Sequence, residues 1–197
     1  MLDTEQINNE MNKLIIDRRF QEIIKKSDEM IDAYPYSYLG RWWKARAYTF
    51  LGDTDKALHW FMEALKNTAS EEEESRVCSS FANVYIIRKD WHNSLKYSEI
   101  ALELNPNNPV AIIARSIALS ATGKKQEAYQ LINEHRGIFR EEYEKACIAA
   151  VLSNKEEMLQ HLRNSVIENP HHKITVLYDP EFEPYLKHND FNKLLKD

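Results

Sequence analysis

The sequence predicts an all-α protein built from about five repeated pairs of helices. Three observations predict this class: a repeat with helical periodicity, a scarcity of residues that break helices, and capping signals at the expected helix boundaries. The 4 glycines and 6 prolines make up about 5% of the 197 residues, against roughly 12% in average proteins. This composition excludes a turn-rich β protein.

The repeat appears when residues 52–65 are slid along the chain, because related segments recur at steps of 34, 37, 34 and 30 residues. One set of equivalent positions is Ile23, Ala57, Ser94, Ala128 and Met158. A second set with the same spacing is Met11, Ala45, Ala82, Ser116 and Ala146. Within each unit, apolar residues recur at i, i+3 and i+4, which predicts two amphipathic helices.

Capping signals mark the ends of these helices. Asn108-Pro109 places a capping side chain before a proline at the first helical position, where the missing N–H costs nothing. Ser70 and Ser153 each stand three residues before a glutamate, which is the spacing of a capping box. Gly52 and Gly123 stand where the chain reverses, and we expect a left-handed backbone there.

These units resemble tetratricopeptide repeats (TPRs) of bacterial type, whose helix–turn–helix unit has 34 residues. In the second unit the matching residues are Ala45, Tyr48, Gly52, Asp53, Ala57, Phe61 and Ala64. In the third unit they are Ala82, Tyr85 and Ala101-Leu102-Glu103-Leu104-Asn105-Pro106. The resemblance implies a right-handed α-α superhelix with a concave groove.

The expected array covers residues 3–170, with helix pairs at about 3–37, 38–74, 75–108, 109–138 and 139–170. Residues 171–197 resemble the tail that follows bacterial arrays of this kind. Because the last pair of an array has no neighbour, we expect this segment to cap its apolar face.

Composition narrows the functional classes. With 26 basic and 31 acidic residues the net charge is −5, so no basic footprint for nucleic acid is present. The polar N-terminus and the lack of a long apolar run predict no membrane segment and a cytoplasmic location. Cys78 and Cys147 lie in apolar helical stretches, where buried, reduced thiols are expected.

No catalytic constellation is found. The phosphate-binding, metalloprotease and nucleophile-elbow motifs do not occur in the sequence. His171 and His172 have no carboxylate or cysteine at i+3 or i+4 to complete a metal site. We therefore expect no enzyme activity, no metal and no cofactor.

The resemblance implies that the first helix of each pair lines the concave groove. Residues one position after the core positions are the candidates for this surface: Asn8, Asn12, Trp42, Arg46, Phe50, Ser79, Asn83, Ile113, Ile117 and Tyr143. Trp42, Arg46 and Phe50 share one helix face at i, i+4 and i+8. We expect these three side chains to be free for a ligand, and Leu51 to pack inside the helix pair. The carboxylate clamp of some TPR proteins is not matched, because Asn8 replaces its lysine.

The sequence therefore predicts a non-enzymatic module, an adaptor, chaperone or regulator, that binds a protein or peptide partner and exists as a monomer or homodimer. One alternative is a regulatory subunit or housing of an enzyme, for which no convergent acid, base and nucleophile are found. Another is a binder of single-stranded RNA, which needs a basic stripe. The expected groove contains essentially one basic residue, Arg46, which does not form such a stripe.

Overall fold

The computed structural model describes residues 3–196, in which helices are connected by short turns and no strand occurs. The α-helices are α1 (Thr4–Ile16), α2 (Phe20–Ala33), α3 (Tyr38–Phe50), α4 (Thr54–Leu65), α5 (Glu71–Ile87), α6 (Trp91–Leu104), α7 (Pro109–Ala121), α8 (Lys125–Glu134), α9 (Glu142–Val151), α10 (Lys155–Glu168), α11 (His172–Thr175) and α12 (Asn189–Lys196). Two 3-10 helices are η1 (Arg136–Ile138) and η2 (Pro180–Tyr185). Within the described range, no helix combines the length and apolarity that crossing a bilayer requires.

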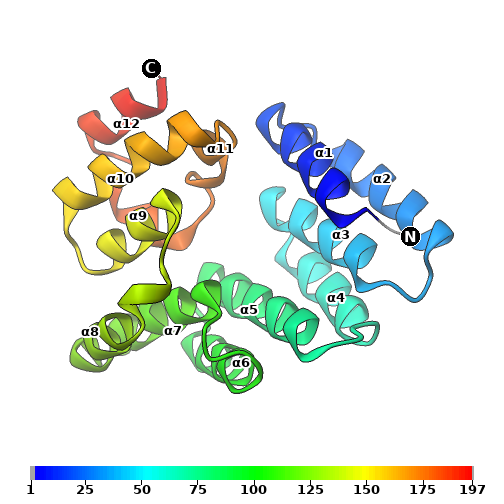
Figure 1. Ribbon diagram of the computed structural model, residues 1–197, viewed down its shortest axis with the longest axis horizontal. Coiled ribbons are helices and arrows are strands. Elements are labelled where there is room, and N and C mark those ends of the chain that lie inside the picture. Colours follow the sequence, from blue (N-terminus) through cyan, green and yellow to red (C-terminus); the bar gives the residue numbers. More distant parts are fainter. Residues whose placement is uncertain (1–2, 197) are drawn as a thin grey trace.

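Helices α1 to α10 follow one another as antiparallel pairs along an arc, so the chain is a right-handed α-α superhelix (Figure 1). One apolar core cluster runs through α1 to α5 and contains the fully buried Trp43 and Phe61. Another runs from α7 to α12 and contains Phe182 and Phe191, which are also fully buried. The arc brings the C-terminal helices opposite α1 and α2.

The turn inside each pair contains one residue with a left-handed backbone. Gly52 (φ 76°) and Gly123 (φ 86°) confirm the expectation for the second and fourth units. Arg18 (φ 54°), Lys89 (φ 58°) and Ser153 (φ 60°) adopt the same conformation at the equivalent positions of the other units. The turn between the two helices of a pair therefore requires a positive φ, even at residues whose side chain makes this conformation unfavourable.

The caps agree with the sequence at two boundaries and differ at a third. Asn108 accepts a hydrogen bond from the backbone N–H of residue 111 (3.1 Å). Ser70 accepts one from the N–H of Glu73 (3.3 Å). The expected cap at Ser153 is wrong, because that residue forms the left-handed turn and Asn154 caps α10 instead.

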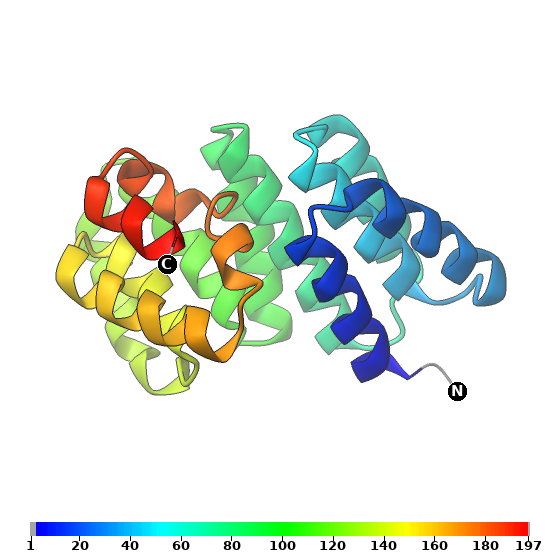
Figure 2. The same cartoon turned by 90° about the horizontal axis from the view of Figure 1, so that it is seen from above.

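The segment after α10 covers the end of the array and then extends towards its beginning. Val176, Phe182 and Phe191 are fully buried in the core cluster shared with α9 and α10. Tyr178 reaches the other side of the arc, where its ring lies edge-on to Phe50 at 5.0 Å between centroids. Figure 2 shows α11 between α1 and the other C-terminal helices. The segment therefore crosses the concave side of the superhelix.

The left-handed turns generate a prediction about stability. Lys89 is exposed, and its positive φ costs about 1 kcal/mol relative to glycine. We expect Lys89→Gly to raise the free energy of unfolding by about 0.5–1 kcal/mol in urea denaturation. The matched control is Lys66→Gly, where φ is −66° and glycine should lower stability by about 0.5–1 kcal/mol. If both substitutions changed the free energy of unfolding in the same direction, the assignment of backbone strain to Lys89 would be contradicted.

A second prediction concerns buried serines at the repeat positions. Ser116 is fully buried, and its hydroxyl has no hydrogen-bond partner within residues 3–196. Alanine stands at the equivalent positions of three other units, so Ser116→Ala should raise the free energy of unfolding by about 1 kcal/mol. The control Ser75→Ala should lower it by about 1–3 kcal/mol, because the Ser75 hydroxyl donates to the carbonyl of Ala101 (2.7 Å). Thermal and urea melts of both variants provide the test.

Candidate functional site

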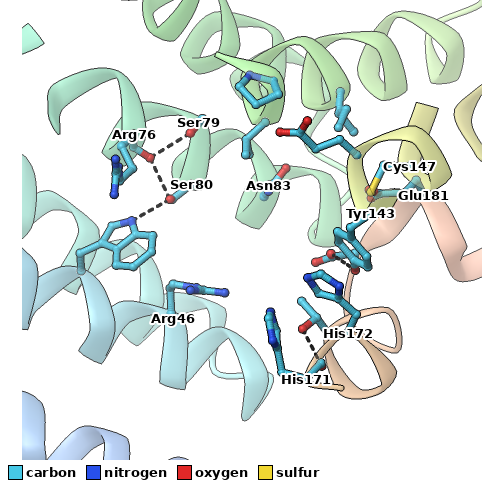
Figure 3. A pocket seen from close by; sticks show the side chains of 17 residues that line it. Arg46, Arg76, Ser79, Ser80, Asn83, Tyr143, Cys147, His171, His172 and Glu181 are labelled. Carbon is cyan, nitrogen blue, oxygen red and sulfur yellow. Dashed lines mark hydrogen bonds between the residues drawn. The ribbon is translucent and has the colours of Figure 1, made fainter. Parts of the chain in front are cut away.

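The concave side contains a pocket with a volume of about 320 Å³ (Figure 3). Its walls come from α3, α5, α7, α9 and the segment after α10. Pockets for small ligands commonly have volumes from about 300 Å³ upward. The candidate residues that line it are Trp42, Arg46, Ser79, Asn83, Ile113 and Tyr143.

Arg46 projects from α3 and is held by aromatic rings. Its guanidinium carbon lies 4.8 Å from the ring centre of Trp42, 4.7 Å from that of Trp43 and 5.7 Å from that of Phe50. Within residues 3–196, no hydrogen bond or ion pair involves this guanidinium. Burial lowers the pKa of Arg46 to about 10, an effect that the nearby Asp179 opposes. Arg46 is therefore a fixed cation at neutral pH.

The two tryptophans that hold Arg46 are themselves fixed by hydrogen bonds. The indole N–H of Trp42 donates to the Ser80 hydroxyl (3.0 Å). The indole N–H of Trp43 donates to the side-chain oxygen of Asn8 (3.2 Å). Trp43 is fully buried, whereas Trp42 is only half-buried and lines the pocket. Trp42 therefore offers ring surface to a ligand.

The opposite wall is acidic. The Tyr143 hydroxyl donates to a carboxylate oxygen of Asp179 (2.6 Å), and Glu181 lies beside Tyr143 and Cys147 (Figure 3). Burial raises the pKa of the Asp179 carboxyl. Burial and the charge of Asp179 together raise the pKa of Glu181 to about 7. The Glu181 carboxyl group therefore gains or loses its proton near neutral pH.

Two histidines of the C-terminal segment complete the pocket without adding charge. His172 is buried, and its Nδ1 forms a hydrogen bond of 2.5 Å with the Ser165 hydroxyl. Burial and the adjacent His171 lower the pKa of His172 to about 4. Burial and the charge of Arg46 lower the pKa of His171. Both imidazoles are therefore neutral at pH 7 and above.

Neither thiol is suited to act as a nucleophile. Burial raises the pKa of Cys78 to about 11, and it raises the pKa of Cys147 well above its ordinary value. Both side chains are therefore protonated at neutral pH, and the thiolate is the reactive form. Among the described residues, no group of three or more His, Cys, Asp and Glu side chains is arranged to hold a metal ion.

The remaining candidates lie outside this pocket. Asn12 on α1 and Ile117 on α7 are half-buried and do not line it. Asn8 also lies outside it and instead fixes Trp43.

The expectation that Phe50 is free for a ligand is wrong. Its side chain is 9% exposed and stacks on Phe20 at 5.2 Å between centroids. Tyr178 packs against the same ring, because the C-terminal segment crosses the concave side at this point. The expectation that Leu51 packs inside the helix pair is also wrong, because Leu51 lies at the turn and is 42% exposed.

Sequence reasoning missed the residues that the C-terminal segment contributes to the pocket: His171, His172, Thr175, Asp179 and Glu181. They lie beyond the last repeat, so no equivalent position in another unit indicates where they point. The available signal is the placement of two carboxylates among the apolar residues of the segment 176–182. Such a pattern is unusual for a segment that only covers a core.

No protein-family model matches the sequence, and no curated protein matches it at a significant level. Two solved structures resemble the fold. YrrB, a TPR protein with an unusual peptide-binding site, is 18% identical, with a TM-score of 0.50 over 86% of this chain and 88% of that chain. TTC0263, a thermophilic TPR protein of Thermus thermophilus, is 14% identical, with a TM-score of 0.59 over 86% of this chain and 96% of that chain. Together with the five helix pairs, these similarities show that the chain has the tetratricopeptide-repeat fold.

Proposed function

We propose that this chain is a non-enzymatic adaptor, chaperone or regulator that binds a peptide, or an extended segment of a protein partner, in the concave pocket. The observation that carries the proposal is the Arg46 guanidinium, which is held between aromatic rings at the pocket wall and forms no hydrogen bond or ion pair with any described residue. Arginine and tryptophan are among the residues that most often dominate the energy of protein interfaces. YrrB, which shares the fold, is itself described as a peptide-binding protein.

The polar groups around Arg46 fit the backbone of a peptide. Asn83 on α5 lines the pocket and makes no side-chain hydrogen bond within the described range 3–196. An asparagine side chain can donate to a carbonyl and accept from an N–H at the same time. Asn83 next to Arg46 and Trp42 therefore provides backbone recognition beside a charged and an aromatic anchor.

The charge of the pocket disfavours RNA. Its acidic wall carries Glu144, Asp179 and Glu181, and carboxylates at this density repel a phosphate backbone. The protonated thiols of Cys78 and Cys147 give no support to the enzyme alternative. These features favour a peptide ligand over both alternatives.

We expect Arg46→Ala to weaken peptide binding by about 1–2 kcal/mol or more. The ligands are peptides selected from a displayed random library for binding to the full chain. Fluorescence anisotropy then measures the affinity of each variant for these peptides. The loss follows from removing the one cation of the pocket that has no partner in the described structure.

The matched control is Arg163→Ala, which removes an exposed arginine from α10, outside the pocket. This variant should bind the selected peptides like the parent. Circular dichroism melts establish that both variants are folded. Equal affinity of the parent and Arg46→Ala for every selected peptide would contradict the proposed site.

A further inference from the structure

The pocket presents two side chains of opposite charge, Arg46 and Glu181, that form no ion pair in the part of the chain that the structure describes. Arg46 extends from α3 on one side, and Glu181 lies in η2 on the other side (Figure 3). Within residues 3–196, neither side chain forms an ion pair. Leaving charges unpaired in a partly desolvated cavity is unfavourable. A ligand that supplies both counter-charges would remove this cost.

Both charges are also held in place. Three aromatic rings surround the Arg46 guanidinium. Glu181 precedes Phe182, whose side chain is fully buried in the core, so the backbone at Glu181 is anchored. The adjacent Asp179 is fixed by its hydrogen bond from Tyr143. The distance between the two charged walls is therefore set by the fold.

We propose that the pocket selects a zwitterionic element of a peptide ligand, in which a carboxylate pairs with Arg46 and a primary ammonium pairs with Glu181. This inference rests on the proposed peptide-binding function and specifies its ligand. A purely anionic ligand would face Asp179 and Glu181, and a purely cationic ligand would face Arg46. Only a ligand with both charges meets attraction at each wall.

The size of the cavity limits the separation of the two ligand charges. A volume of about 320 Å³ is at the lower end of the range for ligand pockets. Adjacent lysine and aspartate side chains within a peptide carry the required groups, and so do the two termini of a very short peptide. A guanidinium can hold the carboxylate with two parallel hydrogen bonds.

Several titratable groups surround Glu181. Asp179 lies on its own segment, and Glu144, Tyr143 and Cys147 extend from α9. Burial raises the pKa values of Glu144, Tyr143 and Cys147. Tyr143 and Cys147 therefore stay neutral between pH 6 and 8.

The other elements that line the pocket also carry charged or titratable groups. Arg46 on α3 remains positive, with a pKa of about 10. Arg76 on α5 pairs with Glu72 at 3.4 Å. His171 and His172 have lowered pKa values. Because the pKa of Glu181 is about 7, its carboxyl group gains a proton as the pH falls from 8 to 6. Binding of an ammonium group should therefore weaken as the pH falls.

The test titrates the ¹⁵N-labelled full chain with four probes and follows the amide and indole signals by NMR. The probes are acetyl-Lys-Asp-amide, acetyl-Lys-Asn-amide, acetyl-Gln-Asp-amide and uncapped glycylglycine. We expect acetyl-Lys-Asp-amide or glycylglycine to bind about tenfold more tightly than either singly charged probe. If acetyl-Lys-Asp-amide binds more tightly, the ligand element is a pair of side chains. If glycylglycine binds more tightly, it is the two termini of a short peptide.

Substitution of Glu181 tests the acidic wall. In Glu181→Gln, affinity for the better zwitterionic probe should fall about tenfold, while affinity for acetyl-Gln-Asp-amide should not fall. For acetyl-Lys-Asp-amide, whose side-chain ammonium stays charged in this range, affinity for the parent should rise about tenfold from pH 6 to pH 8, and this rise should be strongly reduced in Glu181→Gln. The matched control is Glu183→Gln, an exposed glutamate of the same η2 helix, which should behave like the parent.

The zwitterion inference is overturned if a singly charged probe binds as tightly as the zwitterionic ones, or if no probe binds at pH 8. It is also overturned if Glu181→Gln and Glu183→Gln have equal effects. A different result would contradict the proposed function: library peptides that bind the parent and Arg46→Ala equally tightly. Library peptides that need Arg46 but carry no ammonium group would support the proposed function and overturn the zwitterion inference.

Discussion

A helix pair cannot bury its apolar face without a neighbour, so the end of the array must be covered. The segment after α10 does this by placing Val176, Phe182 and Phe191 in the core of the last pairs, where all three are fully buried. Burying a large apolar side chain stabilises the folded state by about 1.5–3 kcal/mol. The path of the segment is therefore set by core packing, and the pocket is a consequence of that path.

The same segment connects the two ends of the arc. Tyr178 packs edge-on against Phe50, which in turn stacks on Phe20. Aromatic pairs in these geometries add about 0.5–1.5 kcal/mol to the burial of their area. Phe50, which was expected in the groove, is consequently part of the core. What stays accessible is the pocket between Arg46 and the carboxylates that the segment carries.

The electrostatic character of the pocket follows from how each charge is stabilised. Arg46 lies against aromatic rings, whose faces attract a cation without neutralising it. Its hydrogen-bond donors therefore stay available to a ligand. Asp179 and Glu181 are partly desolvated, and their pKa values are raised as a result. Perturbed carboxyl groups that converge on a cavity are typical of functional sites.

Local sequence patterns were enough to predict the repeated helix pairs, two of the caps and the left-handed turns at Gly52 and Gly123. Each of these depends on local spacing, which a helix translates directly into faces and ends. These patterns also identified Arg46 and Trp42 as groove residues, because they follow core positions of the repeat. The burial of Phe50 and the position of Asp179 and Glu181 across the pocket from Arg46 could not be predicted in this way. The physical reason is that the segment after α10 lies outside the repeat, so its contacts join residues far apart in the chain and leave no periodic signal.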